Sequence, residues 1–250
     1  MTDIMTDTNA LNSGLRILAV EASGPVAGCA LWENGTLTAE YSVQYKKKHS
    51  QSLVPMLSEM REMVDLELST IDLIAVTSGP GSFTGLRIGS ATAKAIAMAA
   101  GAPMIEVPTL SGLAFNLWGA GSYVCPMMDA RRNQVYTALH SFENGKLITH
   151  IEGEAVAVED MIGRVNSLGK EVIFLGDGAD AYKQILESSV TVPFSFAPAH
   201  LNRQNAASVA VLASELYSEG HTVSADDHSP TYLRVSQAER EGAKNFDLRK

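Results

Sequence analysis

Short apolar runs and apolar–polar alternation dominate the first part of the chain, as expected of β-strands. Such runs at 16–23, 26–34 and 36–45 predict three consecutive strands. The Asn34-Gly35 pair separates the last two runs, and this dipeptide is a strong signal for a tight hairpin. The chain is therefore expected to open with an antiparallel meander.

Helical spacing follows the meander. Segment 50–65 carries apolar residues every three or four positions, at Leu53, Met56, Leu57, Met60 and either Met63 or Val64. Ser50 is expected to cap this helix, and Pro55 falls near its first turn, where proline is tolerated. The pattern then predicts a strand at 72–77, a helix at 84–100, a strand at 103–107 and a helix at 109–118.

The second part of the chain repeats this layout. The stretch "HSFENGKLITHIE" echoes the earlier "LWENGTLTAEYS", and residues 123–156 predict three further strands. After them we expect a helix at 158–168, a strand at 171–175, and helices at 179–188 and 205–219. The repeated order predicts an α/β fold made of two ribonuclease-H-like halves of the actin/hexokinase/Hsp70 (ASKHA) type.

The repeat also sets the expected domain organisation. The first half is predicted to span 15–118 and the second, smaller half 121–203. Residues 204–236 are expected to form a C-terminal helix and tail that pack back on the first half. The two ends, 1–14 and 237–250, are polar and are expected to be flexible.

Charge and composition narrow the class of protein. The net charge of −9 argues against a protein whose main task is gripping nucleic acid, because such a protein needs a basic footprint. The basic clusters Lys46–Lys48 and Arg131–Arg132 are interpreted as solvated edges. The sequence contains no apolar run of membrane-spanning length and does not begin like a signal peptide, so we expect a cytoplasmic protein with no membrane contact.

The cysteines and histidines show no pattern that indicates a disulfide or a metal site. Cys29 and Cys125 lie in apolar, strand-like contexts and are expected to be small buried hydrophobes. The six histidines are scattered, and none shows the spacing of a metal-binding pair on one helix face. No metal site is predicted.

The most specific motif is "SGPGSFTGLRIGSATAKAIAMAAG", from Ser78 to Gly101. Its glycines suit a tight turn, and Ser82 or Thr84 can cap the helix that follows. Gly85, Gly89 and Ala93 form a stripe of small residues on one helix face. We interpret the stripe as a surface for packing against another helix rather than a phosphate cradle, and the sequence lacks the G-K-[ST] signature of a P-loop.

Three weaker sites carry alternative interpretations. Glu21 and Ser23 lie at the end of the first strand, where they either bind Mg²⁺ and phosphate or serve the structure of the turn. Gly176 and Gly178 lie between a strand and a helix, where they either receive an anion or simply form the turn. Asp129 and Arg131 are interpreted as a local salt-bridged hairpin; whether Arg131 and Arg132 contact tRNA is left open.

Several motifs together resemble the TsaB (YeaZ) family. They are "ILAVEAS", "SGPGSFTGLRIGSATAKAIA", "MDARRNQVY" and "P-T-YLR" at 230–234, and the resemblance covers roughly residues 15–236. It implies a role in making the threonylcarbamoyladenosine base (t6A37) of tRNA. One departure is Glu21, because relatives commonly carry aspartate there.

The resemblance also implies how the protein works. TsaB-like proteins are paralogues of TsaD, the subunit that transfers the threonylcarbamoyl group and carries an H-x3-H metal pair. The two histidine positions correspond here to Thr109 and Leu113, and a leucine cannot ligate metal. The resemblance therefore implies a scaffold subunit without its own catalytic centre or intrinsic cofactor, with ATP or ADP bound, if at all, at the complex interface.

The partners implied are TsaD, as a heterodimer, together with TsaE and indirectly TsaC, with tRNA contacted only through the complex. A homodimer is the alternative in isolation. The expected partner-binding residues lie on helices 50–65 and 84–100: Leu53, Met56, Met60, Met63, Phe83, Gly85, Arg87, Gly89 and Ala93. On this hypothesis Gly89→Arg should abolish the complex and leave the fold intact.

Two other functions are weighed against the scaffold. An ATP-binding phosphotransferase of the ASKHA type would need a carboxylate–Mg²⁺ centre, and only Glu21 and the Gly176–Gly178 turn support it. A protease would need a catalytic constellation of Ser, His and Asp, a metal pair or a reactive cysteine, and no such spacing is found.

Overall fold

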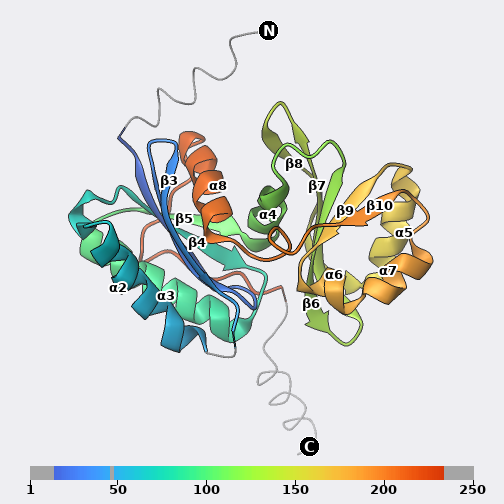
Figure 1. Ribbon diagram of the computed structural model, residues 1–250, viewed down its shortest axis with the longest axis horizontal. Helices are drawn as coiled ribbons and strands as arrows, with labels where there is room; N and C mark the ends of the chain where they lie inside the picture. The colour runs from blue at the N-terminus through green and yellow to red at the C-terminus, as the bar shows by residue number, and fades with distance from the viewer. Residues whose placement is uncertain (1–13, 46–47, 234–250) are drawn as a thin grey trace, which may run out of the picture.

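The computed structural model describes residues 14–45 and 48–233, which fold into two lobes, each built on a five-stranded sheet (Figure 1). Except for Gly14, the tails predicted at 1–14 and 237–250 lie outside the described residues, as do Lys46 and Lys47 of the basic cluster.

The first sheet combines an antiparallel meander with parallel strands. Its order in space is β3 (Thr36–Val43), β2 (Ala27–Glu33), β1 (Arg16–Glu21), β4 (Leu73–Gly79) and β5 (Met104–Pro108). Strands β1, β2 and β3 pair antiparallel, whereas β1, β4 and β5 pair parallel. Nearly every residue of the central strands β1, β2 and β4 is buried, as expected of a sheet covered on both faces.

The second sheet repeats the topology of the first. Its order is β10 (Phe194–Phe196), β9 (Val172–Leu175), β6 (Tyr123–Arg131), β7 (Gln134–Glu143) and β8 (Lys146–Ala157). The equivalent hairpins turn at Asn34-Gly35 and Asn144-Gly145, where all four residues have φ between 50° and 84°. Such left-handed pairs match the twist of the flanking strands. The predicted α/β fold of two ribonuclease-H-like halves of the ASKHA type is confirmed.

Helices cover both faces of the first sheet. On the outer face lie α2 (His49–Met63) and α3 (Phe83–Ala100), and on the inner face lies α8 (Ala206–Ser218) (Figure 1). Lys48, not Ser50, precedes α2, so the predicted cap position is wrong by two residues. Ser82 caps α3: its hydroxyl accepts a hydrogen bond from the Gly85 amide at 3.2 Å.

The second sheet is covered on its outer face by three helices: α5 (Val158–Leu168), α6 (Asp177–Ala181) and α7 (Lys183–Ser189). The single helix predicted at 179–188 is in fact α6 and α7, divided at Tyr182, where the backbone leaves the helical region. The inner face packs on α4 (Thr109–Ala114), which continues as a short 3₁₀ turn, η2 (Phe115–Leu117). A second 3₁₀ turn, η1 (Leu68–Thr70), precedes β4.

Helices α4 and α8 lie between the two sheets, so the lobes share a packed junction (Figure 1). The β7–β8 hairpin reaches across it: the Trp118 indole donates a hydrogen bond to the Gly145 carbonyl at 3.0 Å. Within residues 14–45 and 48–233, no helix combines the length and apolar character that crossing a membrane requires.

After α8 the chain turns back along the first lobe. We call residues 219–233 the C-terminal strap. Val223 and Met104 exchange two backbone hydrogen bonds of 2.9 Å, so the strap covers the open edge of β5. Further on, the Thr231 amide donates to the Ser78 carbonyl at 2.7 Å. The strap therefore ends beside the glycine-rich loop.

Candidate functional site

The glycine-rich loop between β4 and α3 is packed against the turn that follows β1. The Ser82 amide donates to the Ser23 carbonyl at 2.7 Å. A side chain at Gly81 would overlap with that same carbonyl, and one at Gly79, where φ is 123°, would overlap with the backbone of Thr231. The glycines thus allow three backbone segments to meet closely.

The small-residue stripe of α3 faces the chain's own sheet. Gly85, Gly89 and Ala93 are buried. A Cβ on Gly85 would collide with the Ala22 carbonyl oxygen, and one on Gly89 would lie 3.1 Å from the Ala22 Cβ. The prediction that this stripe contacts a partner is wrong, because the small residues let α3 approach the end of β1. An arginine at position 89 would disturb that packing, so it cannot test a complex.

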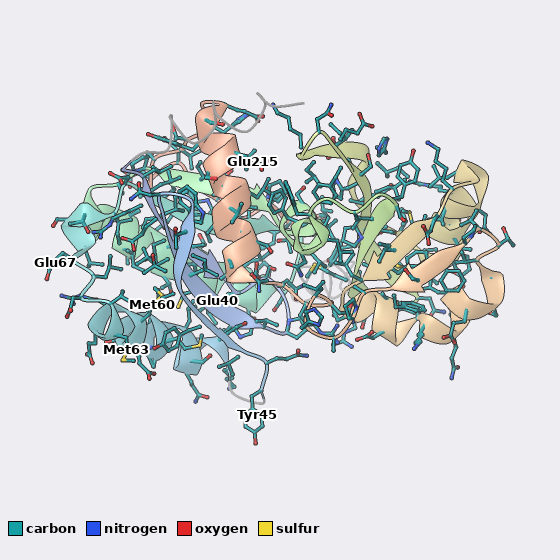
Figure 2. The ribbon with its side chains drawn as sticks, turned by 45° about the horizontal axis from the view of Figure 1, so that its top comes forward. Glu40, Tyr45, Met60, Met63, Glu67 and Glu215 are labelled. Atoms are coloured by element: carbon teal, nitrogen blue, oxygen red, sulfur yellow. The ribbon has the colours of Figure 1, made fainter. Side chains whose placement is uncertain are left out.

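The methionines of α2 do not form one face. Leu53, Met56 and Met60 are 0%, 7% and 0% exposed and pack on the first sheet, whereas Met63 is 73% exposed (Figure 2). The expectation that Leu53, Met56 and Met60 contact a partner is therefore corrected: they belong to the core. Met63 alone of the four is accessible.

The exposed sides of α2 and α3 enclose an apolar groove of about 530 Å³. We call it the α2–α3 groove; its walls are Val54, Leu57, Ser58, Arg61, Ala91 and Ala95, with Leu18 and Met60 among the other lining residues. Val54 is 59% exposed, and Ala91 and Ala95 are exposed as well. The predicted pair of helices thus presents an apolar surface; of the predicted partner-binding residues, only the buried Met60 is among those that line it.

Phe83 and Arg87, the predicted anchors, lie at the N-terminal end of α3. The Arg87 guanidinium carbon lies 4.0 Å from the centre of the Phe83 ring. On its other side Phe83 meets Tyr232 of the strap, with ring centroids 4.8 Å apart. Phe83 is therefore half-buried, while Arg87 is exposed. Tyr232 was not among the predicted residues, since nothing in the sequence brings it to this loop.

Glu21 lies at the end of β1 and is fully buried. Its Oε1 accepts hydrogen bonds from the Ser23 amide at 2.6 Å and the Ser23 hydroxyl at 2.5 Å. Burial raises the pKa of Glu21 to about 7. A carboxylate that is enclosed and already engaged by its own turn is poorly suited to hold Mg²⁺, so Glu21 and Ser23 do not fit the nucleotide–metal centre of a phosphotransferase.

Gly176 and Gly178 also serve close packing. A side chain at either position would overlap with the backbone of Met127 on β6. The Gly176 amide, which an anion would need, instead donates to Asn202 Oδ1 at 2.6 Å. Burial raises the pKa of the nearby Asp177. These contacts favour the structural interpretation of the turn.

Asp129 and Arg131 form the predicted local ion pair. The Arg131 guanidinium lies 3.1 Å from Asp129 Oδ2, and the Arg131 amide donates to Oδ1 at 2.8 Å. Arg131, Arg132 and Asn133 all adopt a left-handed backbone, which closes the β6–β7 turn. The salt-bridged hairpin is confirmed, and a tRNA contact stays a prediction.

The two positions that the TsaB resemblance sets against the TsaD histidines lie on α4. Thr109 and Leu113 are each 1% exposed. Leu113 packs in the apolar cluster between α4 and the second sheet, so its surroundings are those of a core residue. In the described parts of the chain, no three His, Cys, Asp or Glu side chains gather where they could share a metal ion.

Both cysteines are buried, as predicted. Desolvation is the main cause that raises the pKa of Cys29 and of Cys125 to about 12. Neither thiol is poised as a thiolate nucleophile, because a reactive cysteine needs a lowered pKa and access.

Comparison with known proteins agrees with these motifs. The family model for "TsaD: tRNA N6-adenosine threonylcarbamoyltransferase" matches residues 39–242. The TsaB protein of Bacillus subtilis is 32% identical over 227 residues, which cover 90% of this chain and 96% of the relative. That of Escherichia coli is 30% identical over 227 residues, again 90% and 96% of the two chains.

A solved structure agrees as well. YeaZ from Pseudomonas aeruginosa superposes with a TM-score of 0.74 and 25% sequence identity, covering 88% of this chain and all of that chain. The two TsaB relatives carry the name "tRNA threonylcarbamoyladenosine biosynthesis protein TsaB". On the extent and identity of these matches, the chain belongs to the TsaB family, within the group that the TsaD family model describes.

Proposed function

We propose that this chain is a non-catalytic scaffold and activating subunit in t6A37 formation, and that it binds a TsaD-type transferase through the α2–α3 groove. The groove carries the proposal, because it is an exposed apolar surface on the outer face of the first lobe. Exposed apolar residues that lie together, rather than singly, are a feature of interaction sites. Arg61, one of its wall residues, adds a charge that a partner carboxylate can meet.

The match to the TsaD family model supports a partner of the same fold. Two chains with the same outer helix pair can associate face to face about an approximate twofold axis. A homodimer of this chain would use the same groove, so the two assemblies would compete. TsaE joins this complex in our proposal, and tRNA is reached only through it.

Catalysis is assigned to the partner. Thr109 and Leu113 supply no imidazole at the two positions of the metal pair. Glu21 and Gly176 are already engaged by their own neighbours, which speaks against a nucleotide site made by this chain alone. We therefore assign any ATP or ADP site to the interface with the transferase.

Reconstitution tests the role. Purified TsaC, TsaD and TsaE are mixed with tRNA, threonine, bicarbonate and ATP, and the modified nucleoside is measured by mass spectrometry with and without this chain. We expect product only when the chain is present. Equal product in its absence would overturn the scaffold role.

Single substitutions test the surface. Ala91→Arg and Val54→Arg place a long charged side chain in the groove from exposed positions, and each should weaken TsaD binding at least tenfold, as at an interface hot spot. Ala181→Arg is the matched control, since Ala181 is exposed on α6 of the other lobe. Unchanged binding by both groove variants would exclude this surface.

A further inference from the structure

The C-terminal strap is fixed at three places before it reaches the glycine-rich loop. Val223 pairs with the edge of β5, as described above. His228 Nδ1 then lies 2.6 Å from Glu106 Oε1 on β5, and the His228 side chain is completely buried. The Ser229 amide contacts the same carboxylate oxygen at 3.3 Å. Finally, Thr231 bonds to Ser78. Tyr232 therefore follows a well-anchored segment.

Tyr232 ends this path in a three-residue stack. Its ring packs on Phe83, and its hydroxyl lies 3.4 Å from Arg87 Nε. The guanidinium in turn covers the Phe83 ring. The Phe83 ring and the Tyr232 hydroxyl both contact the exposed Arg87 side chain and so favour this orientation, which lowers the entropy that a partner would have to remove on binding. Tyr232 nevertheless remains 39% exposed.

The stack borders the α2–α3 groove. Arg87, Ala91 and Ala95 recur every four residues on α3, so they lie along one face of the helix. Ala91 and Ala95 line the groove, and all three residues are exposed. The aromatic and guanidinium surface is thus continuous with the apolar surface of the groove. Tyrosine and arginine are the residue types that dominate interface energetics.

We propose that the partner surface is composite, and that the C-terminal strap supplies Tyr232 to it as a direct contact. This inference rests on the proposed function, and its occupant is the TsaD-type transferase. The partner element that it fits is an apolar helix face with a carboxylate opposite Arg87, because a guanidinium held in place favours a bidentate carboxylate. His228 and Glu106 act as positioning residues that hold the strap.

Tyr232 variants test the contact. Tyr232→Ala should weaken TsaD binding about tenfold or more, and Tyr232→Phe, which keeps the ring stack, should weaken it less. Tyr217→Ala is the matched control, because Tyr217 on α8 is 38% exposed against 39% for Tyr232. Binding is measured by titration calorimetry, with thermal unfolding of each variant to verify the fold.

His228→Ala tests whether the position of the strap affects binding, separately from the direct contact that Tyr232 makes with the partner. His228 is buried and cannot touch a partner, so binding should weaken only because the strap loosens. Hydrogen exchange of the Thr231 amide reports that loosening: it should accelerate in His228→Ala and stay slow in Tyr217→Ala. Slow exchange together with unchanged binding in His228→Ala would overturn the positioning role.

The groove variants keep the two proposals distinguishable. If Ala91→Arg abolishes binding while Tyr232→Ala binds normally, the composite surface is wrong and the groove proposal stands. If Tyr217→Ala loses as much affinity as Tyr232→Ala, the effect is not specific and the inference fails. If neither Ala91→Arg nor Tyr232→Ala changes binding, the partner binds elsewhere and both the groove and the composite surface are wrong, whereas the scaffold role is decided by the reconstitution.

Discussion

At the scale of the residue, glycine in this chain mainly permits close packing. The sequence marks Gly85 and Gly89 as a pair on one helix face, but spacing alone cannot say what that face meets. The structure places Ala22 there, with its carbonyl oxygen against Gly85 and its methyl group against Gly89. A Cβ at Gly85 would overlap with the carbonyl oxygen outright, whereas one at Gly89 would lie 3.1 Å from the methyl group, so the two glycines are not equivalent.

We expect three Gly→Ala substitutions to change the free energy of unfolding in different directions or hardly at all. Gly85→Ala should lower the free energy of unfolding by about 1–3 kcal/mol, the usual cost of overpacking. Gly89→Ala should be close to neutral, because better helix propensity offsets a tight contact of 3.1 Å with the Ala22 Cβ. A Cβ at Gly163 on α5 would meet no atom within 4 Å. Gly163→Ala should therefore raise the free energy of unfolding by up to about 1 kcal/mol.

Urea unfolding of the three variants measures these differences. Gly163→Ala serves as the internal control for helix propensity. Equal stability of Gly85→Ala and Gly163→Ala would show that the approach of α3 to β1 is less tight than described.

Glu21 makes a pH-dependent contribution to stability. Burial raises its pKa from 4.5 to about 7 in the folded chain. Below pH about 4.5 the carboxyl is protonated in both states and contributes nothing to the pH dependence. Between about 4.5 and 7 the folded state binds more protons than the unfolded state, so stability falls as the pH rises. The contribution is at most about 1.4 kcal/mol per pH unit.

Glu21→Gln isolates this contribution. The amide oxygen can still accept from the Ser23 amide and hydroxyl, but it does not ionise. The stability of the variant relative to the parent should therefore rise between pH 4.5 and 7 and then level off, as followed by urea unfolding across that range. A difference that does not depend on pH would mean that Glu21 titrates normally.

At the scale of the element, periodicity predicted where helices lie better than which side they expose. The helix at 158–168 was predicted with its observed bounds, and α2, α3 and α8 within two residues. On α2, however, apolar residues lie on both sides: Met56 packs on the sheet, while Val54 and Met63 face outward. Apolar spacing identifies the residues that a helix buries. An exposed apolar surface beside them has no spacing pattern of its own, so the sequence does not reveal it.

Strand β10 and the particular contacts of the strap escaped sequence reasoning for physical reasons, although residues 204–236 were expected to pack back on the first half. Strand β10 is three residues long, too short to display a period. The strap has no regular structure over most of its length, and its order comes from contacts far away in the sequence, such as His228 with Glu106. Tyr232 belongs to such a contact, with Phe83 and Arg87, so only the folded chain brings it to the candidate surface.

At the scale of the whole molecule, the two copies of the duplicated fold differ in the surface that their outer helices expose. The two sheets share one strand order, and the first carries the α2–α3 groove between its two outer helices. On the second sheet α5, α6 and α7 are shorter, and their apolar side chains close over the sheet to form a core. On the proposed function, this asymmetry between the lobes would direct assembly to the first lobe.

The same groove should govern self-association. If this chain forms a homodimer in isolation through α2 and α3, both protomers bury the same residues, and a transferase of the same fold must displace one protomer to bind. We expect sedimentation velocity of the isolated chain to give a concentration-dependent monomer–dimer equilibrium. Ala91→Arg should remain monomeric at every concentration, whereas Ala181→Arg should behave like the parent.

Adding the transferase makes the test decisive. Titration of TsaD into the dimer should replace it with a complex of one copy of each chain, with no species that contains two copies of this chain and one of TsaD. Competition of this kind follows only if both assemblies use one surface, because two separate surfaces would allow ternary species. A stable ternary species, or a dimer that survives Ala91→Arg, would place self-association elsewhere on the molecule and restrict the groove to the heterodimer.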